Sequence, residues 1–177
     1  TVQGHLLPAL ETILETHEVN ESALQKAIGD SGFIHADRKL FFFRGFMCGF
    51  EKDISTALHI LVPQVENGIR LVLKQAGISP SNIDANGIEE VWGYERLLNH
   101  EKTKEIFGEN FVYELKSLLV ERLGPNMRNL LSHGLLDADD FNSTTAFYLW
   151  WLLLRLTSYP TRGMSDFIER NRTTDEG

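Results

Sequence analysis

Residues 53–77 read DISTALHILVPQVENGIRLVLKQAG and carry the strongest helical signal in the chain. Large apolar side chains recur there every three or four residues, which is the spacing of one face of an amphipathic helix. They are Ile54, Leu58, Leu61, Val62, Val65, Ile69, Val72 and Leu73. Asp53 suits the N-cap of such a helix, and Gly77 stands where a helix commonly ends. We therefore predict a long helix over residues 53–76 at the centre of an all-α fold.

Helical spacing extends over most of the remaining chain, and strand signals are nearly absent. An amphipathic stripe near the N-terminus comprises Leu6, Leu7, Leu10, Ile13 and Leu14. Further helices are expected from Asn20 to Gly29 and near residues 36–50, 94–98, 103–107, 111–123, 127–133 and 143–158. Residues 78–87 are rich in turn formers and predict a loop, and residues 171–177 predict a flexible tail.

No repeat or linker divides the chain, so we expect one all-α domain over residues 1–177. Its core would be a helical bundle at 53–158, with main helices at 53–76, 110–123 and 143–158. Residues 1–50 would add N-terminal helices to this bundle.

The composition restricts the classes of function. Net charge is −8, from 17 Lys and Arg against 25 Asp and Glu, which disfavours broad, sequence-blind binding of nucleic acid. Cys48 is the only cysteine, which excludes an intrachain disulfide and a multi-cysteine zinc site and predicts a buried, unreactive thiol. The longest apolar run, residues 147–154, is far shorter than the roughly 20 residues of a membrane span. With no signal peptide visible, we expect a cytoplasmic protein without membrane contact. The first residue is not Met, so further domains of a parent polypeptide are compatible with the sequence.

A short basic segment, RNLLSHG at residues 128–134, combines two kinds of chemistry. Arg128 offers a permanently charged planar fork that suits a phosphate, and His133 offers an imidazole that suits proton transfer. Residues 122–136 contain Arg122 besides these two and no acidic side chain, so a focused anion site is predicted there. The alternative is that Arg128 pairs with an acidic side chain and His133 caps the end of a helix. The preceding Asn126 is the expected N-cap of this helix.

The order Arg128, Asn129, three further residues and then His133 resembles the signature of the HEPN superfamily (higher eukaryotes and prokaryotes nucleotide-binding domains). The resemblance continues upstream in LHILVPQVENGIR at residues 58–70 and downstream in AFYLWWLLLRL at residues 146–156, and covers about residues 43–156. It looks like a bacterial HEPN-like branch that often forms the C-terminal part of longer proteins.

This resemblance implies an all-α homodimer and a metal-independent endoribonuclease without cofactors, acting as a toxin in antiviral defence or a stress response. The 2′-hydroxyl of the RNA would attack the adjacent phosphate, giving a 2′,3′-cyclic phosphate and a 5′-hydroxyl. His133 would be general base or acid, Arg128 would stabilise charge on the phosphate, Asn129 would hold His133 or the phosphate, and Ser132 would support them. Two other classes remain open: a non-catalytic module that binds a nucleotide or a partner, and a structural helical adaptor.

Polar residues on the helix at 53–76 form a second candidate cluster. His59, Pro63, Glu66 and Arg70 lie within about 40° of one another around an ideal helix, and Pro63 predicts a kink. In a functional interpretation they shape a polar pocket in which Glu66 orients Arg128 or His133 and Arg70 holds a phosphate. Otherwise Glu66 and Arg70 form a surface ion pair and His59 is half-buried.

Two other segments bear on partners and metals. The helix at 147–154 is apolar on all sides, which predicts either a dimer interface or a central helix in a monomer. Asp137, Asp139 and Asp140 resemble part of a cation loop, but no downstream Glu completes a calcium site. We interpret them as solvated charges that cap the next helix, and we expect no metal site.

Overall fold

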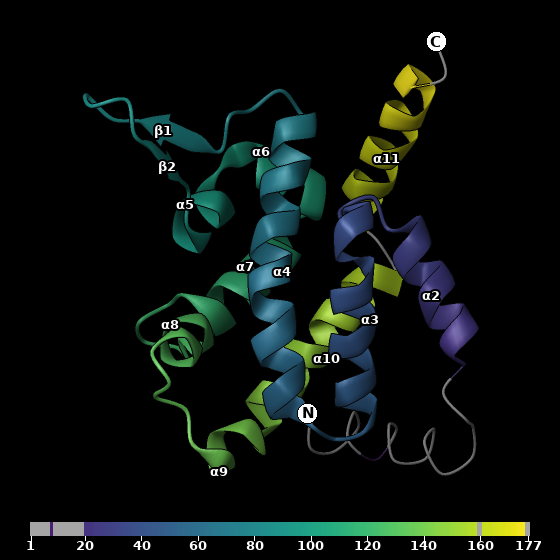
Figure 1. The fold of residues 1–177 in the computed structure, drawn as a ribbon, viewed down its shortest axis with the longest axis vertical. Helices are drawn as coiled ribbons and strands as arrows, with labels where there is room; N and C mark the ends of the chain where they lie inside the picture. The colour runs from purple at the N-terminus through teal and green to yellow at the C-terminus, as the bar shows by residue number, and fades with distance from the viewer. Residues whose placement is uncertain (1–7, 9–19, 159–160, 176–177) are drawn as a thin grey trace.

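The structure is a computed structural model that describes Pro8, residues 20–158 and residues 161–175, with only the backbone described at 171–175. It is mostly helical, which confirms the predicted all-α bundle (Figure 1). The stripe expected at Leu6, Leu7, Leu10, Ile13 and Leu14 lies outside the described residues. The helices before the core are α2 (Glu21–Asp30), the short 3-10 helix η2 (Ala36–Arg38) and α3 (Lys39–Phe50).

Helix α4 (Ile54–Gln75) is the central element, as predicted, and the other helices pack around it. Asp53 caps it, because its carboxylate accepts a hydrogen bond of 3.0 Å from the backbone N–H of Thr56. The whole apolar stripe of the segment is buried against α3, α5 (Tyr94–Asn99) and α10 (Thr144–Ser158). Pro63 lies within the helix on its exposed side, and the helix is continuous on both sides of it.

Glycines let α3 approach its neighbours closely. A Cβ atom on Gly45 would lie 2.6 Å from Cγ of Leu61 on α4. A Cβ atom on Gly49 would overlap the indole of Trp150 on α10 (Thr144–Ser158). The two glycines are one helical turn apart, so a single face of α3 makes both approaches.

Most of α10 is covered by its own chain. Helices α2, α3, α4, α7 and α9 all contact it, and they bury its large apolar side chains. These are Phe147, Leu149, Trp150, Leu152 and Leu153. Only Tyr148, Trp151, Leu154 and Arg155 keep appreciable exposure within 147–155. The inference that this helix needs a second chain to cover it was therefore wrong, and the alternative of a central helix fits.

The candidate site is formed by α5 (Tyr94–Asn99), α7 (Glu109–Leu119) and α8 (Met127–Ser132). Helices α5 and α8 lie across α4 from α3 (Figure 1). Helices α6 (Glu101–Phe107) and α9 (Ala138–Phe141) complete this part of the chain. Helix α7 ends four residues earlier than predicted, because the carbonyl of Lys116 accepts from the N–H groups of both Val120 and Glu121 and closes the last turn. At α9, which was not predicted, Asp137 and Asp140 form a reciprocal capping box. The acidic segment therefore caps this short helix, whereas it was expected to cap the helix at 143–158.

Two further elements, a short hairpin and a C-terminal helix, were not predicted from the sequence. Strands β1 (Ser81–Ile83) and β2 (Glu89–Val91) form an antiparallel hairpin where a loop was expected. The side chain of Asp84 closes the turn of the hairpin by accepting from the N–H groups of Asn86 and Ile88. The strands were not predicted because three residues are too few to show an alternating pattern. Helix α11 (Arg162–Asp175) was not predicted and includes residues 171–175, expected in a flexible tail, since no Gly or Pro interrupts its last turns.

Candidate functional site

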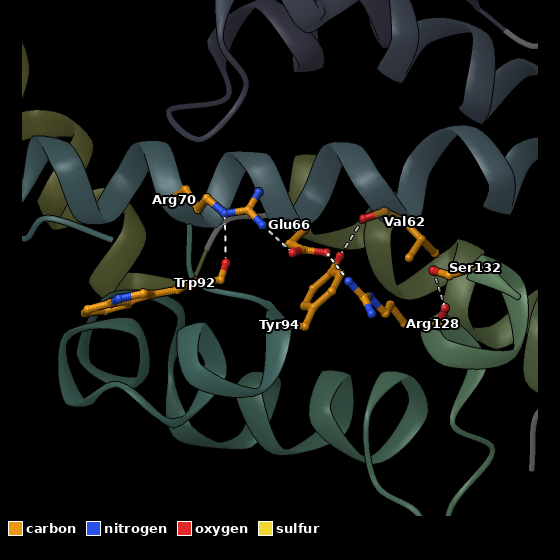
Figure 2. A network of polar contacts seen from close by, with 7 residues as sticks. All are labelled: Val62, Glu66, Arg70, Trp92, Tyr94, Arg128 and Ser132. Atoms are coloured by element: carbon orange, nitrogen blue, oxygen red, sulfur yellow. Dashed lines mark hydrogen bonds and ion pairs between the residues drawn. The ribbon is translucent and has the colours of Figure 1, made fainter. Parts of the chain in front are cut away.

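Helix α8 directs Arg128 toward α4. Met127 and Leu131 are buried beneath the six-residue helix and fix its orientation. Figure 2 shows the Arg128 side chain extending from α8 toward Glu66. Its Nη2 atom lies 3.6 Å from Oε2 of Glu66, and its side chain is 37% exposed. Asn126 is the N-cap residue of α8, as predicted, but it takes a left-handed conformation and its side chain makes no capping hydrogen bond.

Glu66 is a buried carboxylate shared by two arginines. It is 8% exposed, and its other oxygen, Oε1, accepts a hydrogen bond from Nη2 of Arg70. Arg70 also donates from Nε to the carbonyl of Trp92 over 2.9 Å. The Arg70 guanidinium is therefore engaged by protein groups and does not line the pocket described below, which contradicts its predicted role as a phosphate ligand.

Tyr94 packs under this ion-pair network (Figure 2). Its hydroxyl donates a hydrogen bond of 2.6 Å to the carbonyl of Val62 on α4. Burial, and then the negative charge of Glu66, raise the pKa of Tyr94 well above its ordinary value. The hydroxyl thus stays protonated and remains a donor that joins α5 to α4.

A pocket of about 840 Å³ opens beside Arg128. Its walls come from α5, the C-terminal end of α7 and the segment that enters α8. They include Tyr94, Glu95, Arg96, Asn99, His100, Leu119, Arg122, Asn126, Arg128 and Asn129. Three arginines and one carboxylate among these residues make the pocket cationic in a chain of net charge −8.

Arg96 and His100 were not predicted as site residues from the sequence. Arg96 places its guanidinium carbon 4.1 Å from the ring centroid of Trp92, and the Trp92 and His100 rings lie 5.6 Å apart between centroids. Nδ1 of His100 accepts a hydrogen bond of 3.1 Å from the backbone N–H of Lys102. No helical spacing pointed to this group, because Trp92 lies before α5 and His100 lies after its last residue.

His133 lies apart from the pocket of its own chain. It occupies the C-cap of α8, is exposed and is not among the pocket-lining residues. Its backbone N–H, and not its imidazole, bonds to the carbonyl of Asn129 over 3.2 Å. Asn129 is exposed and lines the pocket, whereas the Ser132 hydroxyl donates to the carbonyl of Arg128 over 2.8 Å. Arg128 and Asn129 are thus brought together at the pocket, and His133 is not.

His59 does not join the Glu66 network. Its ring is exposed and lies 5.4 Å from that of Phe141, and its Nδ1 donates to the carbonyl of Ser55 over 2.8 Å. These residues do not gather as predicted, because His59 lies against Phe141, whereas Arg70 donates to the carbonyl of Trp92 and Glu66 lies beside buried Tyr94.

Other features bear on metals, thiols and membranes. In the described ranges, no three His, Cys, Asp or Glu side chains gather as a metal site requires. Cys48 is half-buried, and burial followed by the nearby Asp53 and Glu51 carboxylates raises the pKa of its thiol. None of the helices described is both long and apolar enough to cross a membrane.

Comparisons with protein-family models, with curated proteins and with solved structures found no match for this chain. The site must therefore be interpreted from its own residues. They define a helical protein with a cationic pocket, built on a buried carboxylate that holds two arginines.

Proposed function

We propose that this chain is a metal-independent endoribonuclease of the HEPN type that acts as a homodimer. One observation carries the proposal: Arg128 is held by buried Glu66 at the edge of a cationic pocket that Asn129 also lines. A guanidinium held in place before the substrate arrives stabilises developing negative charge without reorganising during the reaction.

The reaction would use the nucleophile of the substrate. The 2′-hydroxyl of a ribose attacks the adjacent phosphorus, the bond from phosphorus to the 5′-oxygen breaks, and a 2′,3′-cyclic phosphate and a 5′-hydroxyl remain. His133 takes the proton of the 2′-hydroxyl or gives one to the leaving 5′-oxygen, and Arg128 stabilises the pentacoordinate phosphate. No metal-activated water is needed, because the attacking oxygen belongs to the RNA.

The dimer is part of the proposal because His133 does not line the pocket of its own chain. His133 and Asn129 are both exposed on α8, and the large apolar side chains of Leu123 and Leu135 are exposed at either end of this segment. If two copies met across this surface, His133 of one protomer would face the Arg128 pocket of the other. Such a two-fold contact uses the same patch on both subunits.

A second candidate function is a non-catalytic module that binds a nucleotide or a partner. The observation that favours it is the same separation: three arginines line the pocket, while His133 of the same chain does not. In that case the pocket would bind phosphate groups and release them unchanged.

A cleavage assay separates the two functions. The protein is incubated with a 5′-labelled single-stranded RNA in excess chelator, and the 3′ ends of the products are identified by mass. We expect products with 2′,3′-cyclic phosphates, and none when the 2′-hydroxyls of the RNA are methylated. Binding of the RNA without turnover would establish the module and refute the nuclease.

A further inference from the structure

Two arginines in the pocket have no anionic partner. Among the residues that the structure describes, neither Arg96 nor Arg122 forms an ion pair, and both are exposed where they line the pocket. Arg128 is different, because Glu66 neutralises part of its charge. The uncompensated positive charge therefore lies on the α5 and α7 sides of the pocket, away from Glu66.

The guanidinium of Arg96 is already oriented. It stacks over the ring of Trp92. The indole N–H of Trp92 donates to Oδ1 of Asn82 over 3.4 Å, and the backbone carbonyl of Trp92 accepts from Arg70. A side chain that is ordered before binding loses less conformational entropy when the ligand arrives. Trp92 is thus a positioning residue for Arg96, and it connects the pocket to the Glu66 network through Arg70.

His100 adds a neutral donor. Since its Nδ1 accepts from the N–H of Lys102, the proton of the neutral ring resides on Nε2. That N–H is available to donate to an anionic oxygen in the pocket that His100 lines. A neutral donor of this kind suits a phosphate oxygen.

The charge distribution restricts the ligand. Only Glu95 is acidic among the described residues that line the pocket, whereas the whole chain carries −8. Three guanidiniums and a neutral donor fit several phosphate groups on one ligand better than a single carboxylate or an isolated phosphodiester. A cationic pocket in an acidic protein also confines the binding of a polyanion to this place.

We propose that the pocket binds successive backbone phosphates of a single-stranded RNA, with Arg96 and Arg122 holding phosphates that neighbour the one at Arg128. This inference rests on the proposed nuclease function for its choice of RNA as ligand. His100 donates from Nε2 to one of these phosphates. The pocket thereby sets the path of the strand across the site, whereas His133 performs the chemistry.

Binding is measured by fluorescence anisotropy with a short, labelled 2′-O-methyl RNA, which lacks the attacking hydroxyl and is not cleaved. For single strands, each phosphate contact contributes about 0.7 to the slope of log affinity against log salt. The double variant Arg96→Gln with Arg122→Gln should therefore lower that slope by about 1.4. Arg44→Gln is the matched control, because Arg44 is exposed on α3, on the opposite side of α4 (Figure 1). It should leave both slope and affinity unchanged.

A second variant tests the neutral donor. His100→Asn keeps an acceptor for the N–H of Lys102, since Asn is also a good N-cap. The variant loses the Nε2–H group that would donate to the phosphate. We expect RNA affinity to fall by about 10- to 100-fold, the effect of one hydrogen bond to a charged group, at an unchanged melting temperature.

The outcomes separate this inference from the proposed function. Unchanged RNA affinity and salt slope in the double variant would overturn the pocket assignment, even if wild-type protein cleaves RNA. Reduced affinity in that variant would support the pocket even if no cleavage occurs, and the nuclease proposal alone would then fail. ATP and inorganic tripolyphosphate are the remaining probes: if either binds more tightly than the RNA, the pocket is a site for a free polyphosphate and the RNA assignment is wrong.

Discussion

Glu66 holds two guanidiniums with one carboxylate, so the group of Glu66, Arg70 and Arg128 keeps a net positive charge. The arrangement uses the two arginines differently. Arg70, with its side chain 19% exposed, ties α4 to the carbonyl of Trp92. Arg128, the more exposed of the two, keeps donors free at the edge of the pocket. Removing the carboxylate would leave two partly buried cations facing each other.

We expect Glu66→Gln to lower the free energy of unfolding by about 3 kcal/mol, because it leaves the partner charges of a buried ion pair without a counter-charge. Urea denaturation followed by circular dichroism measures the change. Glu90→Gln is the control, since Glu90 is exposed on β2, and it should change stability by less than about 0.5 kcal/mol. If both variants unfold at the same urea concentration as wild type, the network does not stabilise the fold.

His133 is exposed and its ring is free of any hydrogen bond in the described part of the chain, so its removal should affect chemistry and not folding. We expect His133→Ala to slow RNA cleavage by about 10²–10⁴-fold, the usual share of general acid–base catalysis. Its melting temperature should match that of wild type. His59→Ala should cleave at the wild-type rate, because His59 lies against Phe141 and outside the pocket. Cleavage that survives His133→Ala would refute the catalytic assignment.

At the scale of the elements, the contact between α3 and α10 depends on a residue without a side chain. Gly49 lies against the buried indole of Trp150, whose N–H finds no hydrogen-bond partner in the described structure. Edge-to-face packing of Phe50 on Trp150, with ring centroids 5.1 Å apart, adds to the same contact. Close backbone approach, and not polar bonding, therefore holds this pair of helices.

Gly49→Ala should lower the free energy of unfolding by about 1–3 kcal/mol, because the added methyl group would overlap a large ring with little room to move. Gly29→Ala is the matched substitution, since Gly29 is also helical and has open space around its Cα. That variant should be stabilised by about 0.5–1 kcal/mol, because alanine is the better helix former. Chemical denaturation of both variants gives the comparison; equal effects at the two positions would show that α3 and α10 are not closely packed.

At the scale of the whole molecule, the proposed active site needs two chains. Arg128 and Asn129 line the pocket of their own chain, and His133 is exposed outside it. If the partner supplies His133, a dimer of one Arg128→Ala chain and one His133→Ala chain contains one site with both defects and one intact site. Mixing two inactive variants should therefore restore cleavage.

The experiment mixes the two variants after mild denaturant exchange and compares the rate of RNA cleavage with that of each variant alone. Light scattering establishes whether the wild-type protein is dimeric at the same concentration. We expect a dimer and restored activity in the mixture. A dimer without restored activity would mean that each chain completes its own site, and a monomer that cleaves RNA would refute the shared site altogether.

Elements whose signals lie within one segment could be predicted from the sequence. The stripe from Ile54 to Leu73, the cap at Asp53 and the glycine at 77 lie within one segment, so hydrophobic spacing and capping chemistry were enough to predict α4. The same holds for the motif at 128–133, whose helix was predicted to within a residue at either end. Each strand of the hairpin has only three residues, and an alternating pattern cannot be recognised over so short a segment.

Only the tertiary structure decided which side chains meet. Arg96 and His100 join Arg122 and Arg128 in one pocket because Tyr94 ties α5 to the carbonyl of Val62, 32 positions away in the chain. The same packing engages Arg70, forms a pocket that Arg128 lines and His133 does not, and covers the apolar helix α10 within one chain. These outcomes depend on how distant helices are placed against one another, and residue spacing within a helix carries no information about its neighbours.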